Sequence, residues 1–393
     1  MPLFWGMENM EEKTCLCALN RIFGFEPKTA LALISHLGSA SRVFMLTEKE
    51  TDTLLGPYSR HKGKICRKAL DESADELERL SAMGIQFCGI TEEDYPSLLK
   101  ECKDAPIGLY VRSGTPASAL WNGQSVAVVG TRDISPYGKE WCRKLVKGIS
   151  FTDLRPTIIS GLALGVDIEA HRTALEHGLP TIAVMATGPE SVYPHRHRET
   201  AERIASTPGC ALITDYPPGT APLAIHFLRR NRIIAGLSKA TVLVESKIRG
   251  GGMMTCSLAF SYDRDVYALP GRADDIRSQG CNELIRKKIA EPITSASSLI
   301  EELGMKSVAQ PTRISDMERL TRGYSGRISG GDIRLMAQIM SAVRERRGIT
   351  VEEIGTALGT GYRKAAELAG ILEIDGFIVT DLLQRCSINP KIM

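Results

Sequence analysis

The chain has 393 residues, of which 43% are hydrophobic and 24% charged, with a formal net charge of +3. This length is enough for two or three domains, and the composition is that of a globular protein, which excludes a largely disordered chain. No apolar run approaches the roughly 20 residues that a membrane-spanning helix needs.

The beginning of the chain and its cysteines bear on location. Residues 1–13 lack a basic region followed by an apolar one, so they do not predict a secretory signal. The ten cysteines are scattered and form neither a CxxC motif nor a Cys/His quartet with metal-ligand spacing. Reduced thiols, and therefore a cytoplasmic location, are the expectation.

Residues 10–93 predict an N-terminal helical domain. Apolar residues recur at helical spacing in residues 16–22, 30–37 and 69–83. Two short helices around Gly38 are typical of a helix-hairpin-helix, or SAM-like, module, whose turn can present backbone N–H groups to a phosphate. A small helical bundle that only packs is the alternative interpretation.

Residues 94–304 predict an α/β domain. The domain starts with a connector in which three prolines limit regular structure, and then β-branched runs alternate with helical patterns. These runs are residues 125–130, 156–160, 180–186, 210–214, 240–245 and 265–270. Strands that are apolar on both faces and alternate with helices indicate a Rossmann-like, doubly wound, mainly parallel sheet.

The remaining sequence predicts a polar, flexible linker at residues 305–331 and a small domain at residues 332–386. The order helix, helix, helix, hairpin favours a winged-helix domain. We expect Thr350 to cap the helix that carries Glu352 and Glu353, since acids suit the first turn of a helix.

A winged helix can read DNA or bind only protein, and both functions stay open. Arg363 and Lys364 are the basic pair of the expected recognition helix, and Glu367 stands against them.

Small residues follow three of the predicted strands. They are Gly130 and Thr131 before Arg132, Ser160 and Gly161, and Gly250 and Gly251. Ligands of open parallel sheets bind beyond the carboxyl ends of the strands, where N–H groups and helix N-termini can face an anion. The GxGxxG and P-loop fingerprints are absent, so a surface for several phosphates is favoured over a mononucleotide pocket. The alternative is that the glycines only make tight turns.

A basic segment runs from residue 226 to residue 249. Its cations are Arg229, Arg230, Arg232, Lys239, Lys247 and Arg249, against the single acid Glu245. Arginine suits phosphate oxygens and stacks on bases, and Phe227 offers a stacking face, although such a run can also be a solvated surface. We expect Glu245 to orient Arg232 or Arg249 by a charge-assisted hydrogen bond.

Two groups of residues are candidates for a catalytic or a metal site. Asp167, Glu169 and His171 lie two apart on a predicted helix, so their side chains point in different directions, and Asp167 fits the first helical turn. His195 and His197 have no third ligand with the usual spacing. The sequence therefore predicts neither a catalytic residue nor a metal site.

Several motifs, in this order, resemble the DNA-processing protein A family, also called DprA or Smf. They are VAVVGTRDISPYG, ISGLALGVDIEAH, IAVMATGPESVYP, RRNRIIAGLS, VLVESKIRGGGMMTCSLAF and DVYALPG. The resemblance is strong over residues 95–290, and the flanking regions match in kind.

The resemblance implies a non-enzymatic homodimer, joined through its Rossmann domains and without a cofactor. It implies that the protein binds and protects single-stranded DNA and loads the RecA recombinase onto it, in natural transformation or DNA recombination. By motif position, the resemblance implies that Arg132 contacts a phosphate. The residues expected to line the same pocket or lie beside the DNA are Gly130, Thr131, Ser160, Gly161, Arg230, Asn231 and Arg232.

The chain departs from the family pattern at Leu164, where the family has arginine, and at Leu228, where it has proline. Residues 250–256 and 214–215 also differ, which affects affinity and local geometry. Two alternative functions stay open. One is a nucleotide-acting Rossmann enzyme of the nucleoside-monophosphate hydrolase type, whose PGGxGT loop differs from residues 249–252. The other is a scaffold acting through its winged helix.

Overall fold

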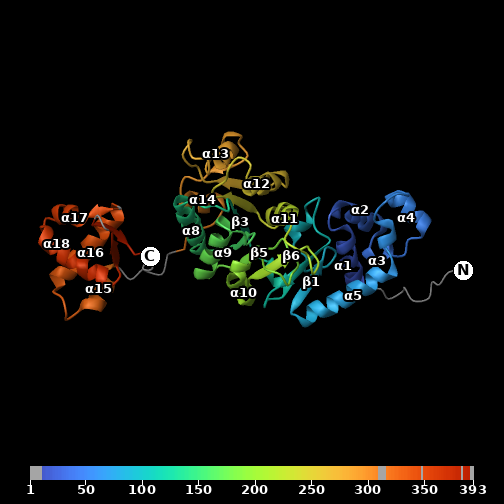
Figure 1. The fold of residues 1–393 in the computed structure, drawn as a ribbon, viewed down its shortest axis with the longest axis horizontal. Helices are drawn as coiled ribbons and strands as arrows, with labels where there is room; N and C mark the ends of the chain where they lie inside the picture. The colour runs from blue at the N-terminus through green and yellow to red at the C-terminus, as the bar shows by residue number, and fades with distance from the viewer. Residues whose placement is uncertain (1–10, 309–315, 347, 382–383, 390–393) are drawn as a thin grey trace. The chain divides into compact units, whose positions relative to one another are not determined.

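The computed structural model describes residues 11–308, 316–346, 348–381 and 384–389 (Figure 1). It forms two compact units, Met1–Val308 and Ala309–Met393. Residues 1–10, where no secretory signal was predicted, lie outside the described residues. So do residues 309–315 of the predicted linker and residues 347, 382 and 383 of the predicted C-terminal domain.

The first unit is built on a nine-stranded sheet with the order β1-β2-β6-β5-β4-β3-β7-β8-β9. All six predicted strands are present, and neighbouring ones pair in parallel, which confirms the mainly parallel sheet. They are β3 (Ser125–Val129), β4 (Thr157–Ser160), β5 (Thr181–Val184), β6 (Ala211–Thr214), β7 (Ala240–Leu243) and β8 (Asp265–Ala268).

Three further strands extend the sheet at its edges. β1 (Ile85–Gly89) and β2 (Gly108–Arg112) form an antiparallel pair, β2 joins β6 antiparallel, and β9 (Glu291–Pro292) pairs with β8. The prediction of only helices up to residue 93 and of an irregular connector was wrong here. Apolar residues of both strands are buried, and the connector prolines lie outside β2, so they do not interrupt its hydrogen bonds.

Helices cover both faces of the sheet because successive side chains of a strand point to opposite faces. Val126 and Val128 of β3 face one core, with α8 (Pro136–Ser150) and α9 (Val166–Glu176). Ala127 and Val129 face the other core, with α11 (Ala224–Gly236) and α12 (Gly251–Ser261). This arrangement places the loops that follow β3, β4 and β7 at one edge of the sheet.

Five helices precede the sheet. They are α1 (Glu12–Phe23), α2 (Pro27–Leu37), α3 (Ala40–Val43), α4 (Glu48–Leu55) and α5 (Arg67–Ala82). As expected, two of them meet at Gly38, which has a φ of +87°. The N–H groups of Ala40 and Ser41 after this turn donate to the Glu12 carboxylate at 2.6 and 3.0 Å. An internal carboxylate thus occupies the donors that a phosphate would use, which favours the packing interpretation.

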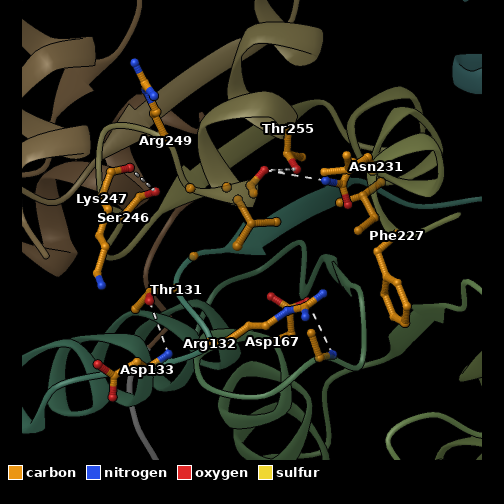
Figure 2. A pocket seen from close by; sticks show the side chains of 18 of the residues that line it. Thr131, Arg132, Asp133, Asp167, Phe227, Asn231, Ser246, Lys247, Arg249 and Thr255 are labelled. Carbon is orange, nitrogen blue, oxygen red and sulfur yellow. Dashed lines mark hydrogen bonds between the residues drawn. The ribbon is translucent and has the colours of Figure 1, made fainter. Parts of the chain in front are cut away.

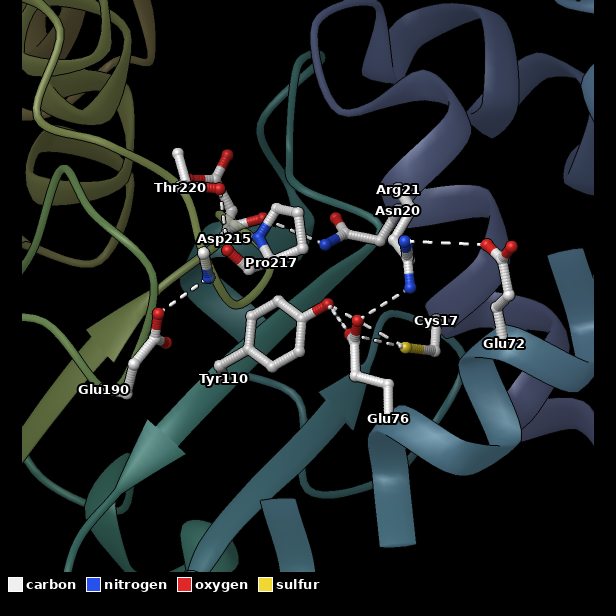
Figure 3. A network of polar contacts seen from close by, with 11 residues as sticks. Cys17, Asn20, Arg21, Glu72, Glu76, Tyr110, Glu190, Asp215, Pro217 and Thr220 are labelled. Atoms are coloured by element: carbon white, nitrogen blue, oxygen red, sulfur yellow. Dashed lines mark hydrogen bonds and ion pairs between the residues drawn. The ribbon is translucent and has the colours of Figure 1, made fainter. Parts of the chain in front are cut away.

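Polar contacts tie these helices to the sheet (Figure 3). The buried Glu76 of α5 accepts hydrogen bonds from Tyr110 of β2 at 2.7 Å and from Arg21 of α1 at 2.9 Å. Asn20 donates to the carbonyl of Asp215, after β6, at 2.9 Å. The apolar side chains of α1, α2 and α5 belong to the same core as one face of the sheet.

The second unit contains α15 (Asp316–Tyr324), α16 (Gly330–Glu345), α17 (Val351–Ala357) and α18 (Tyr362–Ile374). A small sheet pairs β10 (Ile349–Thr350), β12 (Arg385–Ile388) and β11 (Ile378–Thr380) in that order. Part of the predicted linker is therefore helical: Leu320 and Tyr324 of α15 are buried in this core. Leu320 and Tyr324 lie one helical turn apart, so both can pack against this core although most residues around them are polar.

The expected cap of α17 is confirmed. Thr350 accepts from the N–H of Glu353 at 3.3 Å, and the Glu353 carboxylate accepts from the N–H of Thr350 at 2.9 Å. On α18, Lys364 pairs with Asp332 at 3.0 Å and with Glu367 at 3.4 Å.

Among the described residues of both units, no helix has the length and apolar character needed to cross a membrane.

Candidate nucleic-acid interface

A pocket lies where the strand order of the sheet reverses. β3 pairs with β4 on one side and with β7 on the other, so loops leave β3 and β7 toward the same edge. The pocket has a volume of about 390 Å³. Figure 2 shows it with Lys247 and Arg249 on one side and Phe227 and Asn231 on the other.

The loops of the pocket meet backbone to backbone. Gly165 has a φ of +76°, and a side chain there would begin 2.1 Å from the carbonyl oxygen of Thr131. A side chain at Gly252 would begin 3.2 Å from the Cα of Gly130. Gly251, by contrast, has open space where a side chain would stand, so the first turn of α12 is accessible from the pocket. The first N–H groups of a helix lack intrahelical partners and favour an anion.

Three cations surround this helix start. Arg132 follows β3, Lys247 and Arg249 follow β7, and all three are exposed. Within the described parts of the chain, none of the three has an ion pair with an acidic side chain. The acid beside them, Asp133, is paired with Arg277 at 3.1 Å. The rim therefore carries positive charge that is available to a ligand.

An aromatic ring stands next to these cations. The guanidinium carbon of Arg132 lies 5.1 Å from the centroid of the half-buried Phe227 ring of α11. The ring of Tyr193 also lies beside Phe227, with 5.5 Å between the two ring centroids. A flat apolar surface beside free cations is the combination that binds unpaired nucleotides.

The wall of the pocket contains two buried charged residues, Arg230 and Asp167. Arg230 donates from Nη1 to the carbonyl of Gly161 at 2.6 Å and to that of Val184. Asp167 accepts from the N–H groups of Gly161 and Ala163 at 3.2 and 3.4 Å. Burial lowers the pKa of Arg230 to about 10 and raises the pKa of Asp167. Arg230 thus holds the loop after β4 in place, and it is not part of the exposed rim.

Comparison with known families decides where this chain belongs. The family model described as DNA recombination-mediator protein A matches residues 86–304. The chain belongs to this family.

Relatives support the assignment over different shares of their length. DNA processing protein DprA from Streptococcus pneumoniae is 37% identical over 213 residues, 54% of this chain and 72% of that protein. Putative DNA processing protein DprA from Mycobacterium tuberculosis is 30% identical over 341 residues, 81% of this chain and 80% of that protein. The solved structure of DNA processing protein A from Streptococcus pneumoniae has a TM-score of 0.61 and 28% identity. It covers 74% of this chain and 95% of its own.

Most of the residues expected from the family motifs and the basic segment line this one pocket. They are Gly130, Thr131, Arg132, Phe227, Arg230, Asn231, Lys247, Arg249, Gly250 and Gly251. Asn231 donates to the carbonyl of Gly251 at 3.5 Å and so connects α11 with the start of α12.

Four expected site residues lie elsewhere. Ser160 is buried and donates to Val128 O at 2.7 Å, and Gly161 lies behind the Arg230 guanidinium. Arg232 follows the pocket residue Arg230 by two positions on α11, so its side chain points about 200° away from that of Arg230. It is buried in an ion pair with Asp215. Lys239 precedes β7, so the length of the strand separates it from the pocket.

The expected role of Glu245 was wrong. Its carboxylate accepts from the backbone N–H of Ser135 at 2.9 Å and from the Ser135 hydroxyl. Ser135 caps α8, so Glu245 fixes the start of that helix and orients neither Arg232 nor Arg249. The contact was missed because it joins positions 110 residues apart.

Asp167, Glu169 and His171 diverge, as their spacing predicted. Asp167 lies in the first turn of α9, Glu169 pairs with Arg143 of α8, and His171 contacts Thr181 of β5 at 2.7 Å. Ser246 and Thr255 also line the pocket, although they were not predicted. Thr255 follows Gly251 by one helical turn, which was the available signal.

Proposed function

We propose that this pocket binds the sugar–phosphate chain of single-stranded DNA as part of the family's work in recombination. The observation that carries the proposal is the set of three exposed cations without acidic partners at the accessible N-terminus of α12. Phe227 then supplies the stacking surface for a base. A duplex hides the faces of its bases, so this combination favours an unpaired strand.

The test is a titration of labelled oligothymidine at several salt concentrations. Each neutralised phosphate contributes about 0.7 to the logarithmic salt slope of single-strand binding, so three cations contribute about 2. Arg132→Ala is expected to weaken binding and to reduce the slope by about 0.7. Arg67→Ala removes an exposed arginine from α5, paired with Asp71, and serves as the matched control. Unchanged affinity and slope in Arg132→Ala would contradict the proposal, as would tighter binding to a duplex of equal length.

We further propose that the bound strand is protected and passed to the RecA recombinase, and that the protein acts as a cytoplasmic homodimer. The proposed division is an N-terminal part at 10–93 that is helical except for β1, a Rossmann-like DNA-binding domain at 94–304, a linker that α15 interrupts, and a winged-helix domain. RecA loading is tested by following filament assembly on single-stranded DNA with and without the protein. Sedimentation at several concentrations tests the dimer.

A second candidate function rests on Asp167. Its buried carboxyl lines the pocket and has a raised pKa, as a general acid of a nucleotide-acting enzyme would. Its hydrogen bonds to two backbone N–H groups nevertheless give it a structural task in the loop after β4. Incubation with nucleoside monophosphates and chromatography of the products decides, and we expect no released base.

A further inference from the structure

Helix α8 carries an exposed surface that the proposed pocket does not use. An α-helix turns by about 100° per residue, so Tyr137, Trp141 and Lys144 lie within about 60° of one another. Lys139, Arg143 and Lys147 form a second stripe beside them. The buried positions of the helix, among them Cys142 and Leu145, occupy the opposite side. The surface thus combines an aromatic stripe with a basic stripe.

The aromatic stripe is ordered by its own contacts. The rings of Tyr137 and Trp141 meet edge to face with 6.2 Å between their centroids. The Tyr137 hydroxyl donates to the carbonyl of Pro270 at 2.9 Å, which holds a ring that is 42% exposed. The ammonium of Lys144 lies 4.4 Å from the Trp141 centroid. Tyr137 is thus held at the surface, whereas Trp141 is half-buried because it packs against the core beneath α8, and a cation already lies against its ring.

The basic stripe has more cations than its acidic neighbour can neutralise. Lys139 and Arg143 share the single carboxylate of Glu169, which is almost fully buried. Lys144 has no acidic partner among the residues that the structure describes. Across both stripes, Lys139, Arg143, Lys144 and Lys147 stand against the carboxylates of Glu140 and Glu169, so the face keeps a net positive charge, as a surface that holds a polyanion needs.

The start of α8 is joined directly to the pocket. Ser135, its capping residue, comes three residues after Arg132 and is bound by Glu245, which immediately precedes Ser246 and Lys247 of the pocket. The cationic rim at Arg132 and the first turn of α8 therefore lie only a few residues apart in the chain.

We propose that the exposed face of α8 is a second contact surface for single-stranded DNA, continuous with the pocket. Bases stack on Tyr137 and Trp141, and Lys139, Arg143 and Lys144 contact the phosphates. The distance along the helix from Tyr137 to Lys144 is about 10 Å, which is the length of a few nucleotides of an unpaired strand. This inference rests on the proposed function, since it extends the same strand beyond the pocket.

The first experiment uses Trp141 as its own reporter. The chain has three tryptophans, so Trp5→Phe with Trp121→Phe leaves Trp141 as the single one. Stacking of a base is expected to quench its fluorescence on titration with a 12-nucleotide oligothymidine. A 4-nucleotide oligothymidine, chosen to occupy the pocket without extending to Trp141, is expected to leave it unchanged.

The second experiment measures affinity for the same two oligonucleotides. Trp141→Leu keeps apolar packing but removes the stacking face, so it is expected to weaken 12-mer binding about fivefold or more and leave 4-mer binding unchanged. Lys144→Gln is expected to reduce the salt slope of the 12-mer by about 0.7. Arg67→Ala, which removes an exposed arginine of α5 outside the pocket and outside α8, serves as the control with wild-type affinity.

The outcomes separate this inference from the proposed function. If Arg132→Ala weakens both oligonucleotides while Trp141→Leu weakens neither, the pocket stands and the α8 surface is refuted. If Trp141→Leu weakens the 4-mer as much as the 12-mer, its effect is general and also refutes the surface. If neither oligonucleotide binds the wild-type protein, the proposed function itself fails.

Discussion

The guanidinium of Arg132 lies over the ring of Phe227, with 5.1 Å between its central carbon and the ring centroid. The two residues come from different elements: Arg132 lies in the loop after β3, and Phe227 lies on helix α11. Their contact orients the cation and the ring toward one pocket before any ligand arrives. A bound nucleotide can then place its phosphate near Arg132 and its base against the aromatic surface without first ordering either side chain.

Phe227→Ala is expected to weaken binding of oligothymidine by about 1–3 kcal/mol, because base–aromatic stacking contributes this amount. Phe227→Tyr keeps the ring and should bind like the wild type. Fluorescence anisotropy with labelled oligothymidine measures both. Equal affinity of the alanine and tyrosine variants would show that the ring does not contact a base.

Arg232→Met is expected to affect stability and not DNA binding. The side chains of Arg232 and Asp215 are both nearly inaccessible and pair with each other, so removal of the arginine leaves a buried carboxylate alone. Loss of one partner of such a pair costs about 3–5 kcal/mol of unfolding free energy. Urea denaturation measures the loss, and the salt slope of DNA binding should be that of the wild type.

The matched control adds Asp215→Asn to Arg232→Met, which removes the stranded charge and should recover part of the lost stability. If Arg232→Met instead reduces the salt slope as Arg132→Ala does, Arg232 contacts a phosphate. That result would contradict a purely structural role for Arg232.

The sequence was informative wherever local patterns determine structure. The six central strands are short β-branched runs buried on both faces, and their alternation with helices determines a parallel sheet and the edge at which its loops gather. β1 and β2 were missed because their pairing is a long-range contact, and prolines near β2 concealed it. Helix α15 was not predicted because it has few apolar residues, and their helical spacing is a weak signal in a segment that is mostly polar.

The sequence predicted which glycines and cations lie near the site, but not which of their side chains face the pocket. A run of basic residues says nothing about which of them a helix turns inward, so Arg230 and Arg232 were assigned to the rim although both are buried. Lys239 and Lys247 belong to the same run, yet β7 separates them. The partner of Glu245 lies on another element, and no local signal predicts it.

Glu245→Gln is expected to destabilise the fold by about 1–3 kcal/mol, because the buried carboxylate accepts two hydrogen bonds from Ser135 at the start of α8. Thermal and urea unfolding measure this loss. Ser135→Ala removes the same hydroxyl contact and should show a smaller loss in the same direction. A stable Glu245→Gln protein with weakened DNA binding would instead support a role of Glu245 in the pocket.

Truncation after Val308 is expected to leave the affinity for oligothymidine within about twofold, since the pocket lies wholly in the first compact unit. Lys364 of α18 is already paired with Asp332 and Glu367, which leaves it little positive charge for a phosphate. Anisotropy titrations of both proteins test this. A loss of tenfold or more in the truncated protein would assign a DNA contact to the C-terminal unit.

His171 is expected to make the fold less stable in mild acid. Its ring is fully buried against Thr181, its Nε2 has no hydrogen-bond partner within the described residues, and burial lowers its pKa to about 3. An exposed histidine in the unfolded chain has a pKa of about 6.5, so between these values the unfolded state binds a proton that the native state does not. Stability is therefore full above pH 6.5 and falls as the pH decreases, by up to about 1.4 kcal/mol per pH unit. His171→Gln retains a polar group that does not titrate, and its unfolding free energy should decrease less steeply than that of the wild type between pH 6.5 and pH 4.5. Parallel curves for the two proteins in urea denaturation would mean that the native ring takes up a proton in this range.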